Sequence, residues 1–431
     1  MTGRSPVESK RTEGGRWLLS VFFSIVLAAC GERPQPPAPA SDARETPADP
    51  AGAFLERHWE RPLAPQGPAP DRFSAQERSL APADCGACHA AQHADWLTSL
   101  HAHAMGPGLL GQLADMDPGD RDAQQDCIRC HAPLAEQADS LAAALSAPGE
   151  SRPGRAATSR LHEEGLICAA CHVRAHERFG PPRRDGSAPE AAARAALPHN
   201  GFVASAAFED SRFCAACHQF EPDGFALAGK LLENTYEEWK ASRHAREARS
   251  CQSCHMPERR HLWRGIHDPQ TTRGALSIEA PAPRLSGGGV VARLRIRNTG
   301  AGHHFPTYVT PRVVASIWQE DAAGKPLPGT RAELVIQRRV PLDLSREISD
   351  TRIPAGGEAA LEYALPPHPR AVALRLRLLV EPDAFYADLY RSLLASGGGP
   401  GRGRASIRKA LAAAEGSAYV AWEERQPLPE P

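Results

Sequence analysis

The sequence predicts a mainly-α, loop-rich region, followed by a β-sandwich and a short helical tail. Residues 51–275 have weak apolar periodicity and many turn-forming segments, such as the Gly/Pro-rich stretch at 180–189. From about residue 285, apolar and basic residues alternate in several segments, which is typical of half-buried strands. Two apolar-periodic stretches, 383–395 and 405–416, then predict a helical tail that is interrupted by glycines.

The first region contains ten of the chain's 11 cysteines, in five copies of the pattern C-x-x-C-H. Short helices are expected around them at 90–104, 133–145 and 228–247. The first cysteines are 42, 41, 46 and 37 residues apart, without a shared sequence around each copy. The copies, numbered motifs 1 to 5 in chain order, consist of Cys85, Cys88 and His89; Cys127, Cys130 and His131; Cys168, Cys171 and His172; Cys214, Cys217 and His218; and Cys251, Cys254 and His255.

C-x-x-C-H is the attachment signature of haem c. Each thiol forms a thioether with one vinyl group, and the histidine binds the iron as its proximal ligand. This composition predicts only about 0.01 such matches by chance. A zinc site, a redox dithiol or a disulfide framework also uses paired cysteines, but none of them requires a histidine after every second cysteine. We therefore expect five covalently bound haems c in a mainly-α, loop-rich multihaem domain over residues 85–284.

The C-terminal part, residues 285–431, is predicted to be a β-sandwich with the helical tail. In 290–298, Ala292, Leu294 and Ile296 alternate with arginines, and 372–380 repeats this pattern. Several short strands separated by turns are typical of sandwiches. Further strands are expected at 313–319, 332–340 and 358–364.

The N-terminus predicts export. Residues 1–29 combine a basic start with an apolar run and end in Leu-Ala-Ala before Cys30, as in a lipoprotein signal peptide whose cleavage leaves Cys30 to be lipidated. A plain signal peptide with an incidental cysteine is the alternative. Residues 30–84 are a Pro/Ala-rich tether and lead-in. Gly31 after the cysteine favours the outer membrane by resemblance to lipoprotein sorting rules, with the protein facing the periplasm or the cell surface.

The net charge excludes one class of partner. The chain has a formal charge of −1, and ionised haem propionates would bring the oxidised, processed protein to about −8. Nucleic acid is therefore not an expected partner. Redox partner proteins, together with a membrane contact through the lipid, remain the expected interactions.

The composition also predicts the second axial ligands. A haem that only transfers electrons normally has both axial positions filled, by histidine or methionine. The chain has 4 methionines and 18 histidines, so bis-histidine coordination is expected.

Two segments carry a resemblance to a known family. Trp96 to Ala102 and Trp239 to Ala245 share W-x-x-S-x-H-A beside a C-x-x-C-H. This resembles the cytochrome c-554 type domain, which is related to the hydroxylamine oxidoreductase superfamily. The segments 251–268 and 298–307 are similar to further elements of such proteins, including the start of a β-sandwich. The resemblance implies distal ligands among His101, His199, His244, His267 and His303, with His103, His162, His176, His261 and His304 as alternates.

The pair His303-His304 predicts a ligand from the β-sandwich. Neighbouring side chains of an extended segment point to opposite sides, so only one of them can reach a given iron. We expect His303, because it follows Gly300-Ala-Gly302, where the backbone can approach a porphyrin closely.

Three functions remain open at this point. The first is an electron carrier, which the motifs favour. The second is a haem enzyme of nitrogen or sulfur chemistry with one open-coordinate haem, although no motif has the C-x-x-C-K form of pentahaem nitrite reductases. The third is a docking subunit whose β-sandwich binds a partner.

The five motifs predict five haems per chain. A pyridine haemochrome assay of the purified protein measures this number, and Cys→Ala at both cysteines of one motif should remove about one haem. A stoichiometry of three or fewer would contradict the prediction.

Cys30 is expected to be the only anchor. Cys30→Ala should therefore move the protein from the membrane fraction to the soluble fraction without changing its haem content, because Cys30 lies outside every motif. Fractionation under high salt tests this, and a variant that stays with the membrane would show another anchor.

Overall fold

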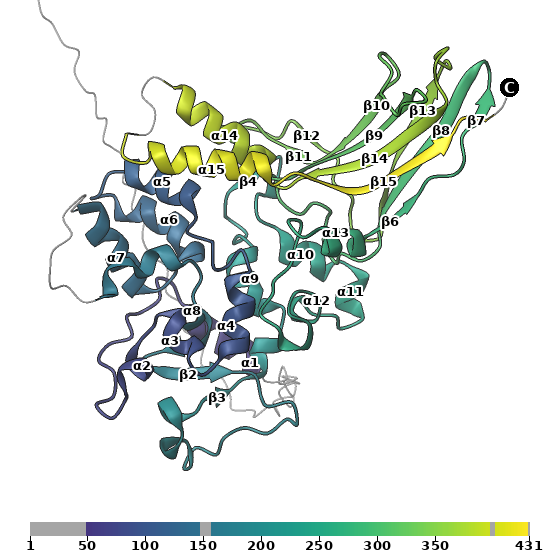
Figure 1. Ribbon diagram of the computed structural model, residues 1–431. Coiled ribbons are helices and arrows are strands. Elements are labelled where there is room, and N and C mark those ends of the chain that lie inside the picture. Colours follow the sequence, from purple (N-terminus) through teal and green to yellow (C-terminus); the bar gives the residue numbers. More distant parts are fainter. Residues whose placement is uncertain (1–48, 147–156, 397–400, 430–431) are drawn as a thin grey trace, which may run out of the picture. The chain divides into compact units, whose positions relative to one another are not determined.

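The structure is a computed structural model that describes residues 49–146, 157–396 and 401–429 (Figure 1). The predicted signal peptide, the lipidation site Cys30 and the first part of the tether lie outside these residues. No described helix is both long enough and apolar enough to cross a membrane.

Short helices carry the motifs, as a C-x-x-C-H pattern requires. In a helical turn, residues i, i+3 and i+4 lie on one face, so both cysteines and the histidine point the same way. Motif 1 spans the end of α3 (Pro82–Gly86) and the residues before α4 (Ala90–Leu97). The other four motifs end a helix at their histidine, namely α6 (Arg121–His131), α8 (Cys168–His172), α9 (Arg212–His218) and α12 (Cys251–His255).

The other elements of this region are equally short. Its remaining helices are α1 (Pro50–His58), α2 (Ala75–Arg78), α3 (Pro82–Gly86), α4 (Ala90–Leu97), α5 (Pro107–Asp115), α7 (Ala135–Ser146), α10 (Thr235–Lys240), α11 (Arg243–Arg246) and α13 (Pro269–Ala275). Its 3₁₀ helices are η1 (Ala157–Glu164), η2 (Arg194–Ala196), η3 (Pro198–Asn200), η4 (Ala206–Glu209) and η5 (Pro257–Arg259). Two small sheets are formed by β1 (Val173–Arg174), β2 (Glu177–Gly180) and β3 (Val203–Ala204), and by β4 (Ala226–Leu227) and β5 (Lys230–Leu231).

Two of the predicted helices are shorter than expected. The helix expected at 90–104 ends with α4 at Leu97 and continues as turns. The helix expected at 228–247 is two helices, α10 and α11, because Ser242 ends the first and caps the second. Its first residues instead form the β4–β5 hairpin, whose turn residues Ala228 and Gly229 both have positive φ. The helix expected at 133–145 is α7.

Two antiparallel sheets form the C-terminal β-sandwich. One has the order β10-β9-β14-β15, and the other has the order β13-β8-β6 with β7 also paired to β8. The strands begin at Leu276, upstream of the predicted boundary at residue 285. Their bounds are β6 (Leu276–Glu279), β7 (Arg284–Ser286), β8 (Gly289–Asn298), β9 (Arg312–Glu320), β10 (Ala332–Ile336), β13 (Glu358–Leu365), β14 (Ala373–Glu381) and β15 (Tyr419–Pro427), with β11 (Arg338–Arg339) and β12 (Ser349–Asp350) as a separate pair.

The alternation of apolar and basic residues in β8 and β14 shows which face of each sheet points into the core. Leu294 of β8 and Leu376 of β14 are fully buried in one apolar core that both sheets share. On the outer face, Arg293 pairs with Glu362 across the strands at 2.9 Å. The apolar residues therefore point into the sandwich and the arginines point out.

The predicted tail is a helical hairpin inserted between two strands of one sheet. α14 (Ala384–Ala395) and α15 (Arg404–Gly416) follow β14, and β15 then returns to pair with it. The strand β15 was not expected, because its charged residues Glu423, Glu424 and Arg425 hide the alternation. α15 packs on α5 of the motif region (Figure 1), and the backbone N–H of Arg402 donates to Asp115 at 2.8 Å.

A buried carboxylate joins the motif region to the β-sandwich. Glu238 of α10 accepts hydrogen bonds from the backbone N–H of His304 at 3.0 Å, from Thr307 Oγ1 at 2.9 Å and from Arg352 Nη1 at 2.9 Å. Arg352 is itself buried, and Asp350 provides its second carboxylate at 2.9 Å. Because buried charges need several partners, this network fixes the segment 303–307 against α10.

Candidate haem-binding centres

Four of the five motif histidines face a second histidine across a similar gap. The pairs and the distances between their ring centroids are His89 and His199 at 6.4 Å, His172 and His261 at 6.2 Å, His218 and His101 at 6.3 Å, and His255 and His303 at 6.3 Å. A metal–imidazole nitrogen bond is about 2.0 Å long, so two imidazoles bound to opposite sides of one iron have centroids about 6.3 Å apart. The four gaps therefore fit one iron each.

Hydrogen bonds at Nδ1 hold most of these rings with Nε2 directed to the gap. The Nδ1 partners of the motif histidines are Phe179 O for His172 (2.8 Å), Tyr308 Oη for His218 (2.7 Å) and Arg264 O for His255 (2.7 Å). Those of the facing histidines are Gly201 O for His199 (2.9 Å), Arg259 O for His261 (3.1 Å) and His304 O for His303 (2.9 Å). Iron-binding histidines typically donate their other ring N–H in this way, because it fixes the tautomer and the ring orientation.

Irregular backbone presents two of the facing histidines. His199 lies in η3 with a φ of 41°, and Glu258 and Arg259, just before His261, have φ values of 54° and 60°. Residues other than glycine rarely adopt this left-handed conformation, and such strain concentrates at functional sites.

The structure brings His303, and not His304, opposite His255. Gly300 and Gly302 are needed for this, because the backbone passes close to two other segments. A Cβ on Gly300 would lie 2.3 Å from the carbonyl oxygen of Gly274, and one on Gly302 would lie 2.9 Å from the Trp239 ring. His304 points the other way, and its Nδ1 lies 3.3 Å from Glu238.

Two expected ligands, His244 and His267, do not face a motif histidine. Nε2 of His267 bonds to Asp383 at 3.0 Å, on the β-sandwich side. His244 is buried, and its Nδ1 has no hydrogen-bond partner among the described residues. His261, an alternate in the sequence analysis, takes the place opposite His172. The second W-x-x-S-x-H-A segment therefore packs its histidine between the motif region and the β-sandwich, whereas the first segment places His101 opposite a motif histidine.

The remaining alternates are also engaged elsewhere or exposed. His162 Nδ1 bonds to Ser140 Oγ at 2.8 Å, and His176 Nε2 bonds to Gly67 O at 3.1 Å. His103 is exposed.

His131 of motif 2 differs from the other motif histidines. Its Nδ1 donates to Ala104 O at 2.7 Å, so its Nε2 is free for iron. Among the facing histidine pairs of the described chain, none contains His131. Ala104 and His101 lie in the same turn. His101 faces the histidine of motif 4, and the Ala104 carbonyl bonds to the histidine of motif 2, so one turn contacts two motifs.

Contacts between thiols give the order of the motifs in space. Cys168 lies close enough to lower the pKa of Cys85, Cys217 close enough to lower that of Cys130, and Cys214 close enough to lower that of Cys251. Cys251 and burial raise the pKa of Cys214, and Cys171 of motif 3 lies close enough to add to this effect. Motif 4 thus adjoins motifs 2, 3 and 5, and motif 1 adjoins motif 3.

Arg61 supports the contact between motifs 2 and 4. Its Nη2 donates to Ala216 O at 2.8 Å and to Cys217 Sγ at 3.1 Å, and its Nη1 lies 3.7 Å from Cys130 Sγ. The sequence pattern does not reveal Arg61, Ala104 or Tyr308, because each lies far along the chain from the motif that it contacts.

The electrostatics of the centres favour neutral histidines. Burial lowers the pKa of His101 to about 3 and that of His172 to about 4. Neutral imidazole is the form that binds iron. The thiols, the paired rings and their orientation thus fit haem c.

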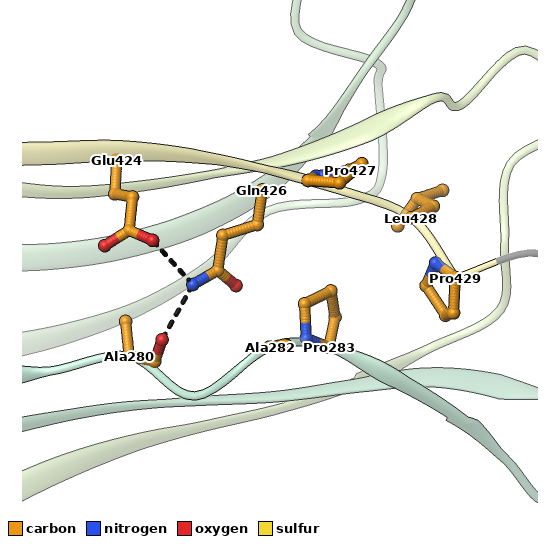
Figure 2. A pocket seen from close by; sticks show the side chains of 8 residues that line it. All are labelled: Ala280, Ala282, Pro283, Glu424, Gln426, Pro427, Leu428 and Pro429. Carbon is orange, nitrogen blue, oxygen red and sulfur yellow. Dashed lines mark hydrogen bonds between the residues drawn. The ribbon is translucent and has the colours of Figure 1, made fainter.

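The surface pockets do not indicate a further reactive site. A groove of about 430 Å³ between the end of β15 and residues 280–283 is mainly apolar and contains no motif residue (Figure 2). Gln426 there donates to Ala280 O at 2.7 Å and to Glu424 Oε1 at 2.9 Å. A smaller hollow of about 150 Å³ includes His199. Within the described residues, no three His, Cys, Asp or Glu side chains are grouped to hold a bare metal ion.

Comparisons with known proteins agree with this chemistry. Residues 84–173 match the protein family described as Cytochrome c554 and c-prime. Over 81% of the chain, the fold is similar to 99% of a penta-heme cytochrome c552 from Thermochromatium tepidum, with a TM-score of 0.53 and 16% sequence identity. No curated protein matches the chain. In its repeated haem-attachment motifs, in residues 84–173 and in its fold, the chain is thus similar to multihaem c-type cytochromes.

Proposed function

We propose that the protein binds five haems c and transfers electrons among them, with four of the haems coordinated by two histidines. The proposed ligand pairs are His89/His199, His172/His261, His218/His101 and His255/His303. The common ring separation of 6.2 to 6.4 Å is the observation that carries this proposal. When bound, haem c supplies a reversible one-electron change at iron, and two histidine ligands favour a low reduction potential. The likeness to a protein described as penta-heme supports the number five.

The contacts between motifs support electron transfer through the whole chain. Motif 1 adjoins motif 3, motif 3 adjoins motif 4, and motif 4 adjoins motifs 2 and 5. Groups attached at adjoining thiols are necessarily close to each other. An electron that enters at any motif therefore reaches the others by short steps.

The cellular setting is part of the proposal. The signal sequence before Cys30 supports export, with a lipid on Cys30 that anchors the protein to the membrane, and Gly31 favours the outer membrane. There the protein exchanges electrons with redox proteins in the periplasm or at the cell surface, and nucleic acid has no role.

A second candidate function rests on His131. No histidine faces His131 among the described residues, and Met105 and Met116 pack in the same cluster as Cys127. If neither sulfur binds, an iron held by His131 would keep one position for a small ligand. Burial raises the pKa of Glu233 to about 8, and Cys130 adds to this rise. Burial also raises the pKa of Tyr386, and Cys127 contributes there. Glu233 is thus largely protonated at neutral pH and can donate a proton, as reduction of a nitrogen or sulfur oxide requires, whereas Tyr386 keeps its proton.

The ligand assignment predicts different outcomes for two neighbouring histidines. His261→Ala should convert one low-spin ferric haem to high-spin, because it removes the imidazole opposite His172. His267→Ala is the matched control and should leave the spectrum unchanged, since His267 bonds to Asp383. EPR of the ferric proteins measures both. A high-spin signal from His267→Ala alone would restore the assignment made from the sequence.

The open position predicts a single reactive haem. The ferric wild-type protein should show one high-spin haem by EPR, and the reduced protein should bind about one equivalent of carbon monoxide per chain. If neither the high-spin signal nor carbon monoxide binding is found, the iron at motif 2 has a sixth ligand. Only the electron-carrier function would then remain.

A further inference from the structure

The exposed thiols identify the two ends of the motif series. Cys88 of motif 1 and Cys254 of motif 5 are exposed, whereas the other eight motif cysteines are partly buried. Motif 1 contacts motif 3, and motif 5 contacts motif 4. Motifs 1 and 5 are therefore the places where a partner protein can come closest to a haem.

Exposed arginines without an ion-pair partner among the described residues lie beside motif 5. Arg243, Arg246 and Arg249, here called the arginine patch, lie on α11 and the turn before α12 (Figure 1). All three side chains are exposed, and none forms an ion pair within the described residues. By contrast, the nearby Arg259 and Arg260 are neutralised by Glu209 and Asp95, both at 2.6 Å.

The arginine patch reaches the motif itself. Arg249 Nη2 lies 3.8 Å from Cys254 Sγ. Arg243 and Arg246 are three residues apart in α11 and lie on the same face of it, and Arg249 follows in the turn after the helix. The chain as a whole has a charge of −1, so this concentration of positive charge is local.

Haem propionates do not account for the patch. In haem c the thioethers lie on the edge opposite the propionates, and Arg249 lies at the thioether of Cys254. Arg243 is already engaged, since its Nη2 donates to Thr299 O at 2.7 Å. The charge therefore faces solvent beside the exposed edge of motif 5.

We propose that the arginine patch is the docking surface for a one-electron carrier protein with an acidic face. This inference rests on the proposed electron-transfer function. The docked carrier would be oxidised by one electron, which a ferric haem held by Cys251, Cys254 and His255 would accept, and no bond would form or break. Complementary charge accelerates such encounters by roughly 10- to 1000-fold at low salt.

The test uses an acidic flavodoxin as the probe and the full-length holoprotein. The variant Arg243→Glu/Arg246→Glu/Arg249→Glu reverses the patch. The matched control, Arg346→Glu/Arg370→Glu/Arg408→Glu, makes the same charge change at three exposed arginines elsewhere. Two quantities are measured at about 10 mM and about 200 mM ionic strength, because screening separates charge effects from packing. They are the Kd for oxidised flavodoxin by calorimetry and the rate of reduction by flavodoxin hydroquinone in stopped flow.

Reversing the patch should weaken flavodoxin binding and slow reduction by about tenfold or more at low salt, with most of the difference lost at high salt. The control triple variant should change both by less than about threefold. Equal losses in both variants, or no loss in the patch variant, would overturn the docking proposal. Reduction by a neutral flavin semiquinone distinguishes the docking proposal from the proposed electron-transfer function. If the wild type and both triple variants are reduced normally, electron transfer stands whatever the outcome for docking. If the wild type is not reduced, the proposed function fails.

Discussion

The fixed separation between facing imidazoles is the constraint on which the rest of the structure depends. Four histidine pairs hold ring centroids 6.2 to 6.4 Å apart, and the backbone adapts to them. Four motif helices end at their histidines, η3 adopts a left-handed φ at His199, and the loop after β8 turns to present His303. Large apolar cores are therefore secondary in the motif region, where the packed groups are the haem-binding side chains themselves.

This constraint explains how the β-sandwich is joined to the motif region. The segment 300–304 leaves β8 and passes Gly274 and Trp239 so closely that only glycines fit. Glu238 then fixes the segment through buried hydrogen bonds to His304, Thr307 and Arg352. The sandwich is thus part of one centre, because His303 comes from it while His255 comes from α12. A role as a separate docking module alone would not need this contact.

The motifs are also coupled to one another rather than arranged as independent sites. The turn after α4 gives His101 to motif 4 and the carbonyl of Ala104 to His131 of motif 2. Arg61 bonds to the thiols of motifs 2 and 4 together. Such shared residues keep neighbouring centres close, which an electron carrier needs. Motif 2 is the one centre whose histidine faces no other histidine among the described residues.

The sequence by itself determined the attachment residues and most of the strands. A C-x-x-C-H pattern is local, because one helical turn brings its three side chains together, and strands such as β8 and β14 show their burial directly as alternation. The sequence did not determine β15, whose alternation is hidden by charged residues. Nor could it choose between His261 and His267, which lie six residues apart near the same motif. Only the tertiary structure decided that choice, because a second axial ligand is selected by which loop crosses the opposite face of a centre, and that depends on packing between segments distant in the chain.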